Sequence, residues 1–229
     1  MSSVEIYIVV EGQTEQTFVR EVLGPYMAYK EIYLHPALIG SPGNKGGNVC
    51  FCRAKKDIVG FLKQRNETYV STMFDYFRID SKWPGRGEVQ QQIQNGGSLP
   101  ATQKAKIIEN ATSDEIIRVF ANAKSRFITY IEMHEFEALL FSDADILAEK
   151  TEIDVSHIQR ILGNYSNPEE INDDPEKAPS KQLMTLNYKY RKIANGKMVS
   201  EAIGIQTIRK KCANFNNWLT KLEHLQGGC

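Results

Sequence analysis

The chain has 229 residues, with 28 Lys and Arg side chains against 28 Asp and Glu, so its formal net charge is zero. This length suits one full-sized domain, or one domain with a small appendage. A composition of 41% hydrophobic and 24% charged residues excludes wholesale disorder. No apolar run approaches the roughly 18 residues of a membrane-spanning helix, and the first residues lack the basic region of a signal peptide.

The four cysteines lack the spacing of a metal site (Cys50, Cys52, Cys212 and Cys229). Such cysteines are typical of free thiols in a reducing compartment. We therefore expect a cytoplasmic protein with no membrane partner.

The charges are distributed unevenly along the chain. Residues 129–180 hold 13 acidic and 3 basic side chains, whereas residues 181–229 hold 2 acidic and 9 basic ones. Two interpretations stay open, namely a solvated helical surface and a carboxylate cluster that binds cations beside surfaces that meet phosphates. The zero total therefore does not exclude a nucleic-acid partner.

The first half of the chain alternates strands with helical segments. Val4–Val10 is β-branched and aromatic, as in a strand covered on both faces. A helix capped by Thr14 follows, and Ile32–Ile39 forms a second strand. After the turn-rich stretch 41–48 and another helix, Tyr69–Phe74 forms a third strand that ends at Asp75.

The second half is mainly helical. Gly85–Pro100 is expected to be a long surface loop, and two short helices are expected at Ala101–Ala111 and Asp114–Ala123, with Thr112 in a capping box between them. Arg126–Ile131 forms a fourth strand. The alternation predicts an α/β fold, a mainly parallel sheet flanked by helices. We expect an α/β domain over 1–142 and a helical C-terminal extension over 143–229.

Acidic residues follow three of the predicted strands, where parallel sheets bind ligands. Glu11 follows the first strand, Asp75 follows the third, and the fourth runs into the acids Glu132, Glu135 and Glu137. Carboxylates that converge in one crevice repel one another unless a cation neutralises them, and oxygen-rich sites suit Mg²⁺ or Mn²⁺. The pattern therefore predicts a metal site for phosphoryl chemistry. Glu11 would be a metal ligand or general acid/base, and Glu15, Asp75 and the acids of the Glu132–Glu137 run would be further metal ligands.

Each candidate also has a purely structural interpretation. Glu15 would stabilise the first turn of its helix through the dipole, Asp75 would cap a loop, and one acid of the Glu132–Glu137 run would lie on a solvated helix face. His134 is a ligand, a general base or a satisfied polar neighbour. The stretch around Lys45, Gly46 and Gly47 lacks the ending of a Walker A loop but retains backbone N–H groups and a cation for phosphate.

Six segments resemble a known family when they are taken in order. Val9–Glu15 (VVEGQTE) resembles the first motif of Toprim domains, especially those of overcoming-lysogenisation-defect-type nucleases. The whole series resembles an uncharacterised bacterial family of Toprim-like proteins. Its segments are VVEGQTE (Val9–Glu15), KGGNVCF (Lys45–Phe51), TMFDYFRIDSKWPG (Thr72–Gly85), YIEMHEFEALLFSD (Tyr130–Asp143), EEINDDPEKAPSKQL (Glu169–Leu183) and AIGIQTIRKKCANFNNWL (Ala202–Leu219).

The resemblance implies roles for individual residues. It implies a Toprim-like (Rossmann-like) fold in which Glu11 is the acid after the first strand and Asp75 begins an Asp-x-Asp pair. Here Phe77 replaces the second acid, which leaves open whether one or two metals bind. Lys181 would be a phosphate-facing catalytic base.

The resemblance also implies partners. Members of the family tend to be encoded beside an AAA or ABC-type ATPase in phage-defence pairs. We therefore expect a Mg²⁺- or Mn²⁺-dependent nuclease that acts on DNA or RNA as the effector of such a pair, with a homo-oligomer as a possibility. The alternative is a non-catalytic binding or regulatory subunit of the ATPase.

Overall fold

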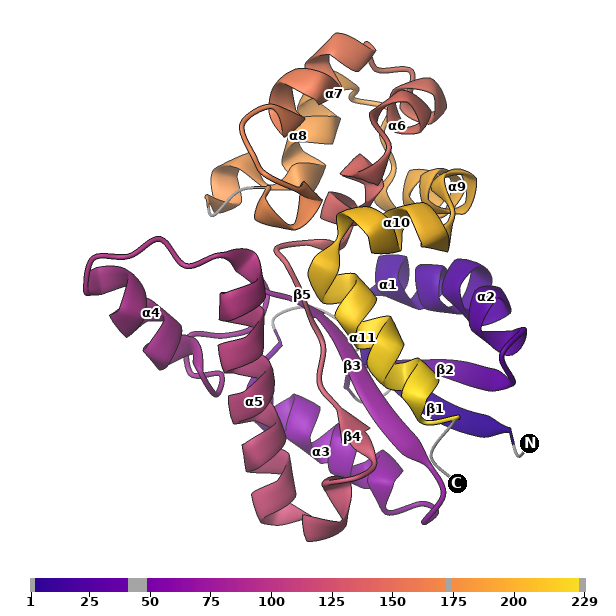
Figure 1. Cartoon of the computed structure of the whole chain (residues 1–229), viewed down its shortest axis with the longest axis vertical. Helices are drawn as coiled ribbons and strands as arrows, with labels where there is room; N and C mark the ends of the chain where they lie inside the picture. Colours follow the sequence, from indigo (N-terminus) through magenta and orange to yellow (C-terminus); the bar gives the residue numbers. More distant parts are fainter. Residues whose placement is uncertain (1–2, 41–48, 172–173, 227–229) are drawn as a thin grey trace.

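A computed structural model describes residues 3–40, 49–171 and 174–226 of the chain. Its centre is a parallel sheet in which β1 lies between β2 and β3, β4 follows β3, and β5 also pairs with β3 (Figure 1). The strands are β1 (Val4–Val10), β2 (Ile32–Leu38), β3 (Tyr69–Asp75), β4 (Phe127–Ile128) and β5 (Ile131–Glu132). The predicted α/β fold with a mainly parallel sheet is confirmed.

The strand order reverses at β1. The chain runs from β1 to β2 on one side, and then returns to place β3 on the other side of β1. Such a reversal leaves a crevice beyond the carboxyl ends of the two central strands. Here those ends are Val10 and Asp75, so Glu11 and Asp75 lie at the position where such sheets bind ligands.

The fourth predicted strand is interrupted rather than continuous. β4 ends at Ile128 and β5 begins at Ile131. Between them, the Thr72 hydroxyl accepts a hydrogen bond from the Tyr130 N–H and lies 2.9 Å from the Tyr130 carbonyl oxygen, to which it donates. A side chain therefore satisfies backbone groups that the sheet would otherwise pair.

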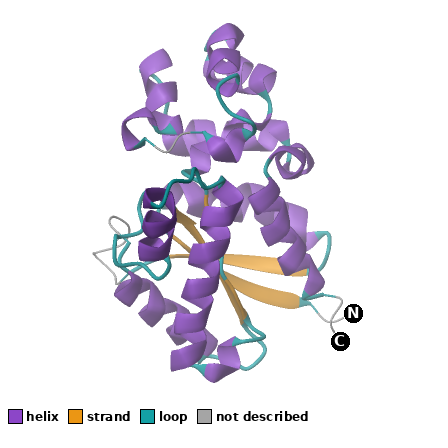
Figure 2. Cartoon of the chain, turned by 60° about the vertical axis from the view of Figure 1, so that its left-hand side comes forward, coloured by secondary structure: helices purple, strands orange, loops and turns teal. Residues whose placement is uncertain are grey.

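Helices cover both faces of the sheet, as Figure 2 shows. The described helices are α1 (Gln13–Phe18), α2 (Gly24–Ala28), α3 (Phe51–Leu62), α4 (Arg86–Gln94), α5 (Ala101–Val119), α6 (Ala144–Thr151), α7 (Val155–Leu162), α8 (Pro179–Leu186), α9 (Lys192–Ile203), α10 (Ile205–Lys211) and α11 (Ala213–His224). The shorter segments are the π-helical η1 (Val19–Leu23) and the 3₁₀ segments η2 (Ala121–Ala123), η3 (Phe136–Ser142), η4 (Pro168–Glu170) and η5 (Pro175–Lys177). Side chains alternate along β1, so Ile8 packs with α1, α2 and the C-terminal helices, whereas Val9 packs with α3 and α5.

Three local expectations are corrected. The stretch Gly85–Pro100 is not one loop, because Arg86–Gln94 is helical. The two expected short helices form the single helix α5, and Thr112 lies buried within it, where its hydroxyl accepts a hydrogen bond from Trp83 Nε1 at 2.8 Å. The first helix begins after Gly12 rather than at a Thr14 cap.

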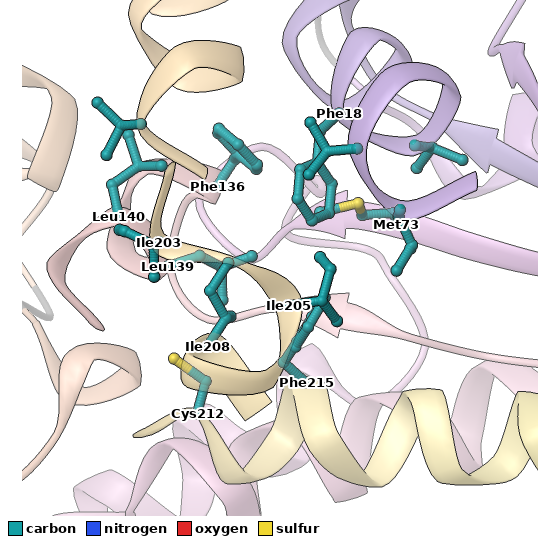
Figure 3. Packing of buried hydrophobic residues seen from close by; sticks show 14 of the residues in the cluster. Phe18, Met73, Phe136, Leu139, Leu140, Ile203, Ile205, Ile208, Cys212 and Phe215 are labelled. Atoms are coloured by element: carbon teal, nitrogen blue, oxygen red, sulfur yellow. The ribbon is translucent and has the colours of Figure 1, made fainter. Parts of the chain in front are cut away.

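The C-terminal residues extend beyond the sheet and then return to it. The helices α6 to α9 lie beyond the carboxyl ends of the strands, and α11 runs back along the sheet (Figure 1). One hydrophobic cluster contains Ile6 and Met73 of the strands together with Phe215 of α11. Figure 3 shows part of this cluster, with Phe136 facing Phe18. The core is thus shared by residues on both sides of the 142/143 boundary.

Among the described residues, no helix is both long enough and apolar enough to cross a membrane.

Candidate carboxylate site

Glu11 is held at the end of β1 in a buried position. Glu11 is 5% exposed, and its Oε1 lies 3.1 Å from Nε of Arg78, which follows β3. Its Oε2 is buried without a hydrogen-bond partner among the described residues. Burial and the neighbouring Glu15 raise the pKa of Glu11 to about 8, against the lowering effect of Arg78.

Glu15 is fixed by the backbone of the turn that precedes its helix. Its Oε2 accepts a hydrogen bond from the Gly12 N–H at 2.9 Å, as in a capping box. A Cβ atom at position 12 would lie 3.0 Å from that oxygen, so Gly12 gives the Glu15 carboxylate room. Burial raises the pKa of Glu15, which is 6% exposed.

Asp75 ends the neighbouring strand and lies close to the other acids. Its Oδ1 accepts a hydrogen bond from the Phe136 N–H at 3.2 Å, which ties the start of η3 to the end of β3. Burial raises its pKa well above the ordinary range, and the next causes are the charges of four carboxylates, those of Glu15, Glu11, Glu135 and Glu137. Acids from the ends of separate strands therefore lie close together around Asp75.

Two further acids come from the segment after β5. Glu135 accepts hydrogen bonds from Ser180 N at 3.0 Å, Ser180 Oγ at 2.8 Å and Lys192 Nζ at 2.8 Å. Glu137 is 1% exposed, and its Oε1 lies 3.6 Å from Lys192 Nζ. Burial and the charge of Glu135 raise the pKa of Glu137 to about 8. We call Glu11, Glu15, Asp75, Glu135 and Glu137 the carboxylate cluster.

Glu132 belongs to a separate buried network. It pairs with Asp75 in the strand register, but its Oε2 accepts a hydrogen bond from the Tyr130 hydroxyl at 2.5 Å. Burial raises its pKa well above the ordinary range, followed by the charge of Glu169. Glu132 lies on β5, Glu135 directly precedes η3, and Glu137 lies within η3. None of these acids is on a solvated helix face, contrary to one of the structural interpretations.

His134 is packed among aromatic rings. It is 1% exposed, its ring stacks on Phe77 with centroids 5.2 Å apart, and it meets the edge of Tyr76 at 5.4 Å. Phe77 stands at the position where the resemblance to Toprim domains implies a second acid. It therefore contributes an aromatic contact beside the carboxylate cluster.

The remaining predicted residues lie elsewhere. The Lys181 ammonium pairs with Glu176 Oε1 at 3.0 Å and lines a groove between α7 and α8. Lys45, Gly46 and Gly47 lie outside the described residues.

Lys192 is the cation that sequence reasoning missed. It is the first residue of α9, its side chain is 38% exposed, and its charge lowers the pKa of Glu11, Glu15 and Glu137. The positive end of a helix dipole disfavours a cation in the first turn. A lysine at that position is therefore a sequence signal for a nearby group of anions.

Glu169 is buried, although the acidic composition of its segment is typical of a protein surface. It is 1% exposed and accepts hydrogen bonds from Asn214 N at 2.8 Å and Phe215 N at 2.9 Å. Both N–H groups lie at the start of α11, where helices leave donors unpaired. Glu169 therefore caps that helix from a distant part of the chain, whereas Glu176 is exposed as expected.

The carboxylate cluster is a candidate site for a divalent cation. The cluster offers carboxylate oxygens, the ligands that Mg²⁺ and Mn²⁺ prefer, and Glu11 Oε2 and Glu137 Oε1 are buried without hydrogen-bond partners among the described residues. Among the described residues, no three His, Cys, Asp or Glu side chains are already placed as ligands of one metal ion. The oxygen donors therefore suit Mg²⁺ or Mn²⁺. The carboxylate side chains would have to rotate away from their present partners to coordinate the ion.

Comparisons with known proteins give a family. A model described as "Domain of unknown function (DUF4276)" matches residues 10–223. The chain belongs to this family. The expected membership of an uncharacterised family is thereby confirmed, while the gene neighbourhood stays a prediction. No curated protein matches the chain. A solved structure, the C-terminal region of the Burkholderia pseudomallei OLD protein, is similar at 14% identity and a TM-score of 0.46, covering 99% of this chain and 100% of that one.

Proposed function

We propose that this DUF4276 protein is a divalent-metal-dependent phosphodiesterase that hydrolyses nucleic acid. The observation that carries the proposal is the gathering of five carboxylates around Asp75, beyond the strand ends where the strand order reverses. Among the described residues, Arg78 and Lys192 form ion pairs with these acids. An excess of negative charge at such a position is what a catalytic cation would neutralise.

Glu11 and Asp75 would hold the metal, since they end the two central strands and are rigidly placed. Glu137 and Glu15 would complete the oxygen set, and the Arg78 and Lys192 contacts would be exchanged for the metal. A bound Mg²⁺ would supply activated water and neutralise charge on a phosphoryl group.

Lys192 would meet the phosphate. The Lys192 side chain is 38% exposed while it contacts Glu135 and Glu137. Once Glu137 has exchanged this contact for the metal, the ammonium would meet a phosphate oxygen while it keeps Glu135. As a flexible point charge with three donors, lysine suits that role. We assign to Lys192 the phosphate-facing position at the cluster that the sequence suggested for Lys181.

The test is cleavage of labelled DNA and RNA in Mg²⁺ or Mn²⁺. Glu11→Gln and Asp75→Asn are each expected to lower the cleavage rate by about 10²-fold or more, as loss of several kcal/mol of barrier stabilisation requires. Glu149→Gln serves as the matched control, because this carboxylate is exposed and forms an ion pair with its neighbour Lys150, away from the carboxylate cluster. Equal cleavage by all four proteins would overturn the assignment.

A second candidate is a non-catalytic subunit of an ATPase in a phage-defence pair. The stacking of Phe77 on His134 favours this function, because an aromatic ring stands where the resemblance to Toprim domains implies a second acid. A protein of this kind would co-purify with the ATPase encoded beside it, and would leave DNA and RNA intact both alone and in the complex. The homo-oligomer also stays a prediction, which sedimentation would test.

A further inference from the structure

A groove of about 300 Å³ runs between α7 and α8. The α7 side contributes His157 and Arg160, and the opposite side contributes Lys177 and Lys181. Ile161 and Leu186 also line it and are half-buried, whereas these four polar residues are exposed. The groove therefore combines a basic rim with an apolar floor.

The acidic groups at this rim offer little competition for an anion. Asp174 Oδ2 lies 3.9 Å from Lys177 Nζ, and the two side chains are 49% and 72% exposed. Glu176 pairs with Lys181 at 3.0 Å, but the Glu176 side chain is 84% exposed and that of Lys181 is 46% exposed. Exposed pairs of this kind contribute roughly 0–1 kcal/mol. A phosphate can therefore replace the Glu176 carboxylate on Lys181 and the Asp174 carboxylate on Lys177 at low cost, while Arg160 adds further positive charge.

The groove lies next to the carboxylate cluster along one helix. Ser180, near the start of α8, donates its N–H and hydroxyl to Glu135, and the next residue is Lys181 of the groove. The cluster itself repels a polyanion. A nucleic acid that reaches it needs cationic contacts on the flank, and α8 supplies one of them, Lys181, directly after Ser180.

We propose that this groove binds an unpaired stretch of nucleic acid, with phosphates on Arg160, Lys177 and Lys181 and a base against Ile161 and Leu186. This inference rests on the proposed function, because it names the substrate class of the same site. The apolar floor selects the single strand, since an unpaired base exposes its face whereas a duplex keeps its bases stacked inside.

The test is fluorescence anisotropy of a labelled 12-nucleotide DNA or RNA, single-stranded or annealed to its complement, in EDTA so that cleavage plays no part. The variant Arg160→Ala/Lys181→Ala removes two exposed cations of the rim. The matched control is Arg118→Ala/Lys124→Ala, which removes two exposed cations at the end of α5 and at η2. Thermal melts verify that all proteins are folded.

We expect the wild type to bind the single strand about tenfold more tightly than the duplex. The groove variant should lose about tenfold of that affinity, and its salt slope should fall by about 1.4, the value for two lost phosphate contacts on a single strand. The control should bind as the wild type does. Unchanged binding by the groove variant, equal binding of duplex, or equal competition by poly-glutamate of the same charge would each overturn the proposal.

The outcomes separate this inference from the proposed function. If Glu11→Gln abolishes cleavage but the groove variant binds normally, the groove assignment fails and the proposed function stands. If the groove variant loses binding but the wild type never cleaves in Mg²⁺ or Mn²⁺, the groove stands and the phosphodiesterase assignment fails.

Discussion

The Trp218 indole lies flat on the Tyr130 ring, with ring centroids 4.3 Å apart and planes 4° apart. Trp218 comes from α11, near the end of the chain, and its Nε1 also donates to Ser71 Oγ of β3 at 2.8 Å. Tyr130 donates its hydroxyl to Glu132. This stack therefore joins the last helix to the sheet directly beneath the strand end that leads into the carboxylate cluster.

Trp218→Ala should destabilise the whole protein rather than its last helix alone. Removing a fully buried indole costs about 3–5 kcal/mol, and the change also leaves Ser71 without this donor. Urea unfolding followed by circular dichroism should show one transition at lower urea. Trp218→Phe should keep most of the packing, so it should lose only about half as much free energy of unfolding as Trp218→Ala. Two separate transitions would show that α11 is not part of the same cooperative core.

Lys192→Met should make stability more dependent on pH. Lys192 lowers the pKa of Glu137, which is still about 8 with the cation present. Without the cation, the folded protein binds protons more tightly still, so stability is retained at low pH and is lost as pH rises. We expect a loss of about 1–3 kcal/mol at pH 8, discounted for the partial exposure of Lys192, and a smaller loss at pH 6.

The control for that experiment is Lys197→Met, on the same helix. Lys197 is 39% exposed and pairs with Glu21 and Glu201. Thermal melts of this variant should fall little at either pH. An equal effect of the two substitutions would contradict the role given to Lys192.

Glu109 should limit stability above neutral pH. Burial raises its pKa from 4.5 to about 7, against the lowering by Lys221 and the Ile131 N–H. A carboxyl with a raised folded pKa favours folding below about pH 4.5, and this contribution is lost as pH rises to about 7. Glu109→Gln should therefore stabilise the protein at pH 8 by up to about 3 kcal/mol and have little effect at pH 4.5.

Chemical unfolding at the two pH values measures this difference. Glu115→Gln, on the same helix but in an ion pair with an exposed arginine, should show no such gain. A Glu109→Gln variant that is less stable than the wild type at pH 8 would show that the Lys221 contact outweighs the burial of the charge.

Local patterns in the sequence were sufficient for the strands and for the acids that follow them. The β-branched runs gave β1, β2 and β3 to within one residue, and the parallel topology then placed Glu11 and Asp75 together. The split between β4 and β5 was not predictable, because it depends on the Thr72 hydroxyl bonding to Tyr130, a contact between residues 58 apart in the chain. Helix α4 was missed because glycines flank its glutamine-rich sequence, a composition typical of loops.

The cationic part of the site was harder to find than its acids. Lys192 is one of 9 basic residues after position 180, and only the packing of α9 against α1 and η3 brings it to the acids. Glu169 had the composition of surface, and its capping role depends on where α11 begins. Long-range packing, which a single sequence does not display, decided both.

The central claim is that the carboxylate cluster is a divalent-metal centre, and titration of Mn²⁺ followed by the electron paramagnetic resonance signal of the free ion tests it most directly. The wild type and Glu149→Gln should show a saturable site that is lost in Glu11→Gln/Asp75→Asn. Because burial already raises the pKa of both acids, these neutral replacements should leave the thermal melt unchanged or raise it, so lost binding reports on the site. Equal Mn²⁺ affinity in the double variant, or no binding by the wild type, would contradict the account.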